Sequence, residues 1–364
     1  MKQTAIFPGR YVQSEGVLQT LDEELTQLGK NVLVVAGRTA AKSLVPPLLP
    51  HWQQHFEVNV ERFGGECSDE EISKLAAIAR NRNCDVVVGM GGGKVIDTAK
   101  AVGYEAKTRV AIVPTIASTD APTSAVSVIY TSTGAFSRYL FLPCNPDLVL
   151  VDTQVISRAP VRFLVAGMGD ALATWFEADS CRQSYSNNQC GGLGTLAGYS
   201  LARLCYETIL ENGVSAKTSC EQQVVTPALS HVIEANTLLS GLGFESGGLA
   251  AAHSIHNGLT TLEGTHAYYH GEKVAIGVLA GLFLGDRPSE VINEVYDFCE
   301  SVDLPTTLAA VGIGDASDEE LQQVALGACA DGETIHHEPF PVSPDSVFAA
   351  LKTADQIGRE RQLI

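Results

Sequence analysis

The sequence contains few basic residues for its length. It carries 24 Lys and Arg residues against 42 Asp and Glu residues in a chain of 364, a formal net charge of −18 at pH 7. Nucleic acids and anionic lipid surfaces attract proteins through clusters of Lys and Arg, so this balance argues against both as partners. We therefore expect a small-molecule substrate, with no nucleic-acid partner and no membrane partner.

Long apolar runs and paired cysteines are also missing. The longest nearly apolar stretch covers residues 274–284, which is shorter than the roughly 18 residues that a transmembrane helix needs. The first residues lack the apolar core of a signal peptide. The nine cysteines include no C-x-x-C pair, which argues against a cysteine zinc cluster and is typical of free thiols in a reducing compartment. These features predict a cytoplasmic protein.

The distribution of apolar residues predicts two domains. Short β-branched runs alternate with helical patterns in the first part, at residues 31–36, 55–60, 85–90, 109–113 and 147–151. This alternation is typical of βαβ units and a parallel sheet. After residue 152, helical periodicity dominates, at residues 162–180, 193–212, 220–241 and 288–302. We predict an α/β domain over residues 1–158 with a parallel Rossmann-like sheet, an all-helical domain over residues 159–364, and a cofactor site in the cleft between them.

A glycine cluster follows one of the predicted strands. The apolar run 86–88 stops at Gly89-Met90-Gly91-Gly92-Gly93, and a helix-like pattern resumes at Lys94. Glycines let a backbone approach an anion, and a helix N-terminus offers unpaired N–H groups. The cluster is neither a Walker A motif nor a complete G-x-G-x-x-G fingerprint, because a lysine stands at the last position of the latter. It predicts a phosphate cradle, with a tight turn that binds no ligand as the alternative.

A second polar loop follows the next predicted strand, over residues 114–125. Ligands of open parallel sheets bind outside the carboxyl ends of the strands, so the two loops are expected to face one pocket. The alternative is a pair of ordinary βα turns in which Ser and Thr cap helices.

Five motifs resemble the glycerol dehydrogenases, which belong to the iron-containing, or group III, alcohol dehydrogenase family. They are G-M-G-G-G-K-x-x-D-T-A-K at 89–100, P-T-I-A-S-T-D-A-P-T-S at 114–124, G-M-G-D-A-L-A-T-W at 167–175, G-F-E-S-G-G-L-A-A-A-H at 243–253 and Y-Y-H-G-E-K-V-A at 268–275. The motifs occur in family order. The resemblance implies a dehydroquinate-synthase-like architecture and a homo-oligomer. It also implies the NAD-dependent, zinc-assisted, reversible oxidation of glycerol or a related vicinal diol to dihydroxyacetone by hydride transfer.

The resemblance assigns Asp170, His253 and His270 as metal ligands that take part in catalysis. Two imidazoles and one carboxylate suit a catalytic Zn²⁺ that keeps a fourth position open. Spacing alone does not select these residues, because the chain has nine histidines. His256 and His266 are each close to a predicted ligand in the sequence, and we expect them to be structural residues or residues that hold a ligand in place.

The metal motif departs from that of the iron-binding members. In those members, the first ligand lies in a D-x-x-x-H pattern, in which the histidine is a further ligand. In this chain, Thr174 stands four residues after Asp170, in the place of that histidine. A set of three protein ligands favours zinc over iron.

The resemblance also assigns substrate and cofactor residues. Asp120 matches the position that contacts the substrate, with a helix N-cap as its competing role. The positions that match cofactor contacts are Gly91, Gly92, Gly93, Lys94, Asp97, Thr115, Ser118, Ser124, Val126 and Tyr130.

The end of the strand over residues 31–36 departs from the family pattern. Family members usually place an Asp there to bind the adenosine ribose, whereas this chain has Ala36-Gly37-Arg38. An arginine in this place can receive the 2′-phosphate of NADP. We expect NAD as the cofactor with some tolerance of NADP, and the alternative is that Arg38 is only a surface charge.

Two other functions remain open at this point. A dehydroquinate-synthase-like lyase has the same fold, nicotinamide cofactor and divalent metal, but regenerates its cofactor. The third possibility is a catalytically silent protein that binds NAD or a metal. Net turnover of the cofactor distinguishes the dehydrogenase from the lyase, because the lyase regenerates its cofactor.

Overall fold

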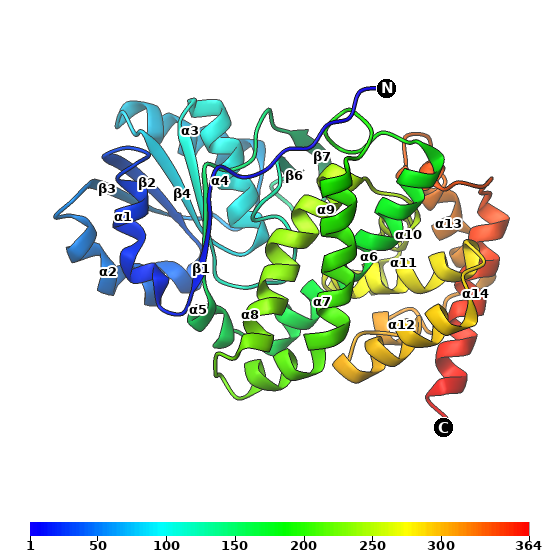
Figure 1. The fold of residues 1–364 in the computed structure, drawn as a ribbon. Coiled ribbons are helices and arrows are strands. Elements are labelled where there is room, and N and C mark those ends of the chain that lie inside the picture. Colours follow the sequence, from blue (N-terminus) through cyan, green and yellow to red (C-terminus); the bar gives the residue numbers. More distant parts are fainter. Residues whose placement is uncertain (364) are drawn as a thin grey trace. The chain divides into compact units, whose positions relative to one another are not determined.

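The computed structural model describes residues 1–363 and divides into two compact units. The sheet unit comprises Ile6–Val161 and Ser219–Gly241. The helical unit comprises Met1–Ala5, Arg162–Thr218 and Leu242–Ile364. The elements of both units are labelled in Figure 1.

The sheet unit is built on six parallel strands in the order β1-β8-β5-β4-β2-β3. The central strands are β-branched on both faces and almost wholly buried, as expected where helices cover both sides of a parallel sheet. The strands are β1 (Tyr11–Ser14), β2 (Asn31–Ala36), β3 (Glu57–Arg62), β4 (Val86–Gly91), β5 (Arg109–Pro114) and β8 (Leu148–Asp152).

Helices cover both faces of this sheet (Figure 1). On one face, Leu21 of α1 and Trp52 of α2 pack into a hydrophobic cluster with alternate residues of β2, such as Val34. On the other face, α4 packs on β4 and β5, and α3 packs on α4. The helices of the unit are η1 (Val17–Thr20), α1 (Leu21–Leu25), η2 (Ala40–Leu44), α2 (Val45–Trp52), α3 (Asp69–Asn81), α4 (Gly93–Ala106), α5 (Thr153–Ser157), α8 (Pro227–Glu234) and η3 (Ala235–Leu239).

The loop after β5 leads into an antiparallel hairpin, β6 (Val126–Tyr130) and β7 (Phe136–Phe141), and not into a helix. The alternative of two ordinary βα turns is therefore wrong for this loop. The glycine cluster after β4 does open a helix, because α4 begins at Gly93.

The predicted helical stretch 220–241 is wrong as a single helix. The helix α7 (Leu196–Glu221) ends before Gln223, which has a positive φ of 58°, and α8 begins at Pro227 with Thr226 as its N-cap. Proline suits the first turn of a helix but not its interior, so it starts a new helix here. This segment packs in the sheet unit, where Asn236 Nδ2 donates to the Ala117 carbonyl at 3.0 Å. The predicted boundary at 158/159 is a single cut, whereas each compact unit consists of more than one segment.

The helical unit contains α6 (Val161–Ser184), α7, α9 (Ser240–Gly247), α10 (Ala251–Leu259), η4 (Glu263–Ala267), α11 (His270–Leu284), α12 (Ser289–Val302), η5 (Ala309–Val311), α13 (Asp318–Ala328), η6 (Thr334–His337) and α14 (Pro344–Arg361). The helix α11 is buried along most of its length because it is apolar on all sides, and it packs against α10 and α14. Within residues 1–363, this unit has no strand beyond an isolated bridge, and no helix of either unit is long and apolar enough to cross a bilayer. The predicted fold class, a parallel α/β part with an all-helical part, is confirmed.

Candidate active site

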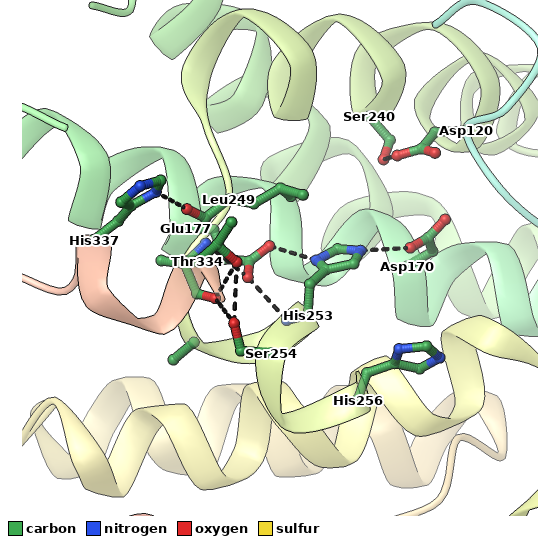
Figure 2. Close-up of polar contacts among 12 residues, drawn as sticks. Asp120, Asp170, Glu177, Ser240, Leu249, His253, Ser254, His256, Thr334 and His337 are labelled. Atoms are coloured by element: carbon green, nitrogen blue, oxygen red, sulfur yellow. Dashed lines mark hydrogen bonds and ion pairs between the residues drawn. The ribbon is translucent and has the colours of Figure 1, made fainter. Parts of the chain in front are cut away.

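The three predicted metal ligands come together in the helical unit. Asp170 lies on α6, His253 on α10 and His270 at the start of α11. Oδ1 of Asp170 is 3.1 Å from Nε2 of His270 and 3.5 Å from Nε2 of His253. Figure 2 shows the His253 ring between two carboxylates, with Asp170 on one side. All three ligand atoms lie within 4.8 Å of one another.

These separations fit a single divalent metal ion. Zinc binds nitrogen and oxygen ligands at about 2.0–2.1 Å in a tetrahedral arrangement, which places neighbouring ligand atoms roughly 3.3 Å apart. The distances of 3.1 and 3.5 Å lie on either side of that value. The side chains are therefore arranged to hold a divalent cation without a large rearrangement.

Two glycines allow the ligand-bearing helices to approach so closely. A Cβ atom on Gly169 or on Gly271 would collide with backbone atoms of the facing helix, the Gly271 carbonyl in one case and the Ala166 carbonyl in the other. Because neither residue has a side chain, α6 and α11 meet backbone to backbone next to Asp170 and His270.

Glu177 holds the ring of His253. It follows Asp170 by seven residues on α6, so both carboxylates lie on the same face of the helix. One Glu177 oxygen accepts the Nδ1–H of His253 at 2.6 Å, and the other accepts the backbone N–H groups of Ala250 and His253 at 3.0 and 2.9 Å (Figure 2). An ionised carboxylate only accepts hydrogen bonds, so Nδ1 carries the proton and Nε2 faces Asp170.

A longer chain of hydrogen bonds orients His270. Nδ1 of His270 is 3.0 Å from Nε2 of His256, whose Nδ1 is 3.1 Å from Oδ1 of Asn257. Nδ2 of Asn257 donates to both oxygens of Glu333, at 3.0 and 3.2 Å. Because Glu333 accepts, Asn257 must direct its amide oxygen to His256, and a neutral His256 must then accept from His270.

The electrostatics of the cluster favour a cation. Burial opposes ionisation of Asp170, but the facing imidazoles of His270 and His253 outweigh it and hold the pKa of that carboxyl well below its usual range. Burial alone would also lower the pKa of His253, yet Glu177 and Asp170 raise it well above the usual value. Carboxylates that stabilise a proton on this ring would also stabilise a divalent ion in its place. The pKa of His256 is lowered by burial first and then by its neighbours, so His256 stays neutral.

The other candidate ligands lie outside the set. Thr174, four residues after Asp170, is buried, and a Cβ on Gly243 would collide with its methyl group. His266 is exposed and hydrogen-bonds through Nε2 with the Thr260 carbonyl at 2.9 Å. The residues that could hold a metal here are therefore Asp170, His253 and His270, with His256 next to His270.

In the sheet unit, the two predicted loops meet at the carboxyl edge of the sheet. Gly91 pairs with Pro114 in the β4 and β5 register, and the Thr115 N–H donates to the Gly91 carbonyl at 3.0 Å. A Cβ on Gly92 would lie 2.9 Å from Cδ1 of Ile116, whereas a Cβ on Gly93 would have only Oγ1 of Thr119 nearby, at 3.7 Å. The backbone is thus open at Gly93 in the first turn of α4, as an anion cradle requires, whereas Ile116 lies against Gly92.

Lys94 stands in the first turn of α4, where its Nζ contacts the Glu66 carboxylate at 2.6 and 2.8 Å. The same ammonium lies 4.8 Å from the centre of the Tyr130 ring. Its side chain is half exposed, so the ion pair with Glu66 is open to exchange with another anion.

Sequence reasoning missed the role of Lys100, whose buried ammonium holds the loop after β5. Nζ lies 3.0 Å from Oδ1 of Asp97 and donates to the carbonyls of Ala121 and Ser124 at 2.9 and 3.2 Å, and also to that of Val126. The signal in the sequence was a lysine within the apolar pattern of residues 95–103. The contacts of Lys100 include Asp97 and Ser124, two residues that the resemblance assigned to the cofactor.

The segment 235–240 holds the same loop from another side. Thr123 Oγ1 donates to the Thr237 carbonyl at 2.8 Å, and Ser240 Oγ donates to Oδ2 of Asp120 at 3.0 Å (Figure 2). Asp120 lies in a bend and does not start a helix, so its competing role as an N-cap is wrong. The remaining predicted cofactor residues lie in the loop or on the hairpin, namely Thr115, Ser118, Val126 and Tyr130.

Comparison with known proteins places the chain in a family. A family model described as iron-containing alcohol dehydrogenase matches residues 8–153. The glycerol dehydrogenase of Thermotoga maritima is 61% identical over 362 residues, which cover 100% of this chain and 99% of the relative. The chain belongs to the iron-containing alcohol dehydrogenase family.

Two solved structures of this family match the whole fold. The glycerol dehydrogenase of Schizosaccharomyces pombe superimposes with a TM-score of 0.95 at 39% identity and covers 99% of this chain, with 92% of that chain matched. A probable glycerol dehydrogenase from Sinorhizobium meliloti gives a TM-score of 0.91 at 43% identity, with 99% and 100% covered. The predicted resemblance and the prediction of an oxidoreductase are confirmed, which favours a dehydrogenase over the lyase and the silent protein.

The first prediction concerns the candidate metal ligands of this chain. Asp170→Asn removes the negative charge of one ligand and His270→Ala removes a ligand atom, so each should abolish most metal binding and most alcohol oxidation while the far-UV circular dichroism spectrum stays unchanged. His266→Ala is the matched control, and it should keep both properties. Full activity in a variant shown by elemental analysis to be free of metal would contradict the assignment.

The second prediction concerns Glu177, both of whose oxygens accept hydrogen bonds. Glu177→Gln replaces one acceptor with an NH₂ group that must face an N–H donor, so the orientation of His253 is lost. We expect metal affinity to fall by about 10–100-fold, as measured by competition with a chromophoric chelator. An unchanged metal affinity would show that Glu177 does not position His253.

Proposed function

We propose that the chain catalyses the reversible, NAD-dependent oxidation of glycerol, or of a related vicinal diol, to dihydroxyacetone or the corresponding ketone, with Zn²⁺ as the resident metal. The observation that carries the proposal is the ligand set Asp170, His253 and His270, in which both imidazoles are oriented by fixed hydrogen-bond acceptors. The relatives at high identity are glycerol dehydrogenases, which supports glycerol as the substrate.

Alcohol oxidation requires removal of a proton from oxygen and of a hydride from carbon, and a free alcohol hardly ionises at neutral pH. A divalent metal held by Asp170, His253 and His270 would supply a Lewis acid that polarises the alcohol oxygen. Glu177 and His256 keep the ligand nitrogens aimed at one point, so the ligands need no reorganisation. The family name refers to iron, but we propose zinc. The reason is that Thr174 stands where the D-x-x-x-H pattern of the iron-binding members has a histidine as a fourth ligand.

The sheet unit would bind the cofactor. The turn of Gly91, Gly92 and Gly93, which is open at Gly93, and the N-terminus of α4 suit the pyrophosphate, and Lys94 would exchange Glu66 for a phosphate oxygen. The network of Lys100 and the contacts of segment 235–240 fix the loop that carries Asp120, which we assign to a hydroxyl group of the substrate. A preordered loop lets the binding energy of the substrate orient its reacting carbon.

The proposal extends to the setting of the enzyme. Its partner is a small polyol, and it works in the cytoplasm as a homo-oligomer. All nine cysteines are free thiols, as a reducing compartment favours, and burial raises the pKa of several of them, Cys67 to about 12.

A panel of alcohols tests the proposed function. The protein is stripped of metal with a chelator, reloaded with Zn²⁺ and assayed for net formation of reduced NAD with glycerol, 1,2-propanediol, 2,3-butanediol and the mono-alcohol 1-propanol. We expect turnover of the vicinal diols, loss of activity on chelation and recovery with zinc. No net formation of reduced cofactor with any diol, or activity that survives complete chelation, would contradict the proposal.

The third prediction concerns the choice between NAD and NADP. Gly37, the residue after β2, lacks the carboxylate that would repel a 2′-phosphate, and the exposed Arg38 follows it. Arg62, also exposed, pairs with Ala36 at the same end of the neighbouring strand β3. Two guanidinium groups at this edge favour an extra phosphate on the ribose, so the enzyme should use NADP more readily than an Asp-bearing relative.

Gly37→Asp should raise the ratio of kcat/KM for NAD over NADP by about tenfold or more, since a charge-assisted contact is worth about 1.5–3 kcal/mol. Arg38→Ala and Arg62→Ala should each shift the ratio in the same direction. Gly37→Ala is the matched control, because its Cβ meets only Cγ2 of Val95 closely, at 3.2 Å, and it adds no charge. If the ratio of kcat/KM for NAD over NADP is identical in all variants, none of these positions contacts the ribose or its 2′-phosphate.

A further inference from the structure

A second cluster of metal-binding side chains lies in the sheet unit, far along the sequence from the first set. It consists of Asp22 on α1, His51 in the last turn of α2 and His55 just after that helix. Nε2 of His51 is 3.2 Å from Oδ2 of Asp22, and Nε2 of His55 is 3.9 Å from the same oxygen. The three ligand atoms all lie within 4.8 Å of one another.

The hydrophobic core places both imidazoles on the same side of the chain. His51 and His55 are four residues apart, so a helical backbone presents them together. The backbone stays helix-like past the end of α2, because the N–H groups of His55 and Phe56 both donate to the Trp52 carbonyl at 2.9 Å. Trp52 and Phe56 are buried in the core of the sheet unit, which leaves His51 and His55 facing outward with ring centres 5.1 Å apart.

Asp22 provides an independent sign of a cation. Its side chain is buried in the first turn of α1, and only 8% of the residue is exposed. Oδ2 faces both imidazoles, whereas the buried Oδ1 has no hydrogen-bond partner among residues 1–363. A buried carboxylate oxygen without a partner is costly, and a metal ion bound by this carboxylate would offset that cost.

We propose that Asp22, His51 and His55 form a second site for a divalent transition-metal ion such as Zn²⁺, separate from the site of alcohol oxidation. The His51 distance to Asp22, 3.2 Å, resembles that of His270 to Asp170 and lies near the roughly 3.3 Å expected for tetrahedral zinc, whereas His55, at 3.9 Å, would have to approach by about 0.6 Å. The donor chemistry of two imidazoles and one carboxylate is also the same.

The surroundings distinguish the two sites. The imidazoles of His51 and His55 are about half exposed, with side-chain exposures of 49% and 48%, so water completes the coordination and the ion exchanges easily. An ion bound here joins α1 to the end of α2 over the hydrophobic core. The site therefore stabilises the sheet unit and takes no part in hydride transfer.

Counting bound zinc tests the proposal. The metal-free chain is titrated with Zn²⁺ in competition with a chromophoric chelator at neutral pH. We expect two zinc ions per wild-type chain, the weaker of which disappears in the double variant His51→Gln/His55→Gln with at least a tenfold loss of affinity. That variant should keep the tighter zinc and full zinc-restored alcohol oxidation, whereas Asp170→Asn should keep only the weaker zinc. His231→Gln, another exposed histidine of the sheet unit, is the matched control and should keep both.

A second measurement guards against loss of folding in the double variant. The chain has two tryptophans, so Trp175→Phe leaves Trp52, next to His51, as the only one. Ni²⁺ should quench its fluorescence at low concentration, and His51→Gln/His55→Gln in the same background should abolish this quenching while the emission maximum stays unchanged. A single zinc per wild-type chain, or a second zinc whose affinity the double substitution leaves unchanged, overturns the proposal.

Discussion

The candidate active site depends on the hydrogen bond between the Glu177 carboxylate and the ring of His253. Glu177 is almost fully buried, and one of its oxygens is already used by two backbone N–H groups at the start of α10. The other oxygen therefore fixes Nδ1 of His253 as a donor and turns Nε2 toward Asp170. The same carboxylate thus starts a helix, orients a ligand and adds negative charge beside the metal position.

The ring of His270 is controlled in another way. Its Nδ1 meets a buried neutral histidine, not a carboxylate, and the proton position is set at the far end of the chain of hydrogen bonds by Glu333. The carboxylate thus lies two residues away, beyond His256 and Asn257, and still sets the tautomer of His270.

Much of the fold could be predicted from the sequence, because the strands of a doubly covered sheet are runs of β-branched residues. The runs at 31–36, 109–113 and 147–151 coincide closely with β2, β5 and β8. The hairpin β6 and β7 was missed, since its strands mix polar and apolar residues and β7 is largely exposed. The break at Gln223 was missed because periodicity continues on either side of it, although Pro227 marks the restart.

The site residues divide in the same way. The candidate ligands were predicted from the family motifs, whereas the residues that position the site depend on contacts between distant segments, such as Asn257 with Glu333 or Lys100 with the loop after β5. Glu177 left a local signal, since a spacing of seven residues from Asp170 places two carboxylates on one helix face. No comparable signal connects Asp22 to His51, because only the packing of α1 and α2 in one core brings them together.

The central claim is that Asp170, His253 and His270 together hold one divalent ion beside the reacting alcohol. X-ray absorption spectroscopy of the His51→Gln/His55→Gln protein loaded with one equivalent of zinc tests it most directly, because the ligands of this site alone then contribute to the spectrum. The account predicts about four nitrogen or oxygen ligands at roughly 2.0–2.1 Å, two of them with the multiple-scattering pattern of imidazole, and loss of this imidazole pattern in His270→Ala. A spectrum with sulfur ligands, or one that His270→Ala leaves unchanged, would contradict it.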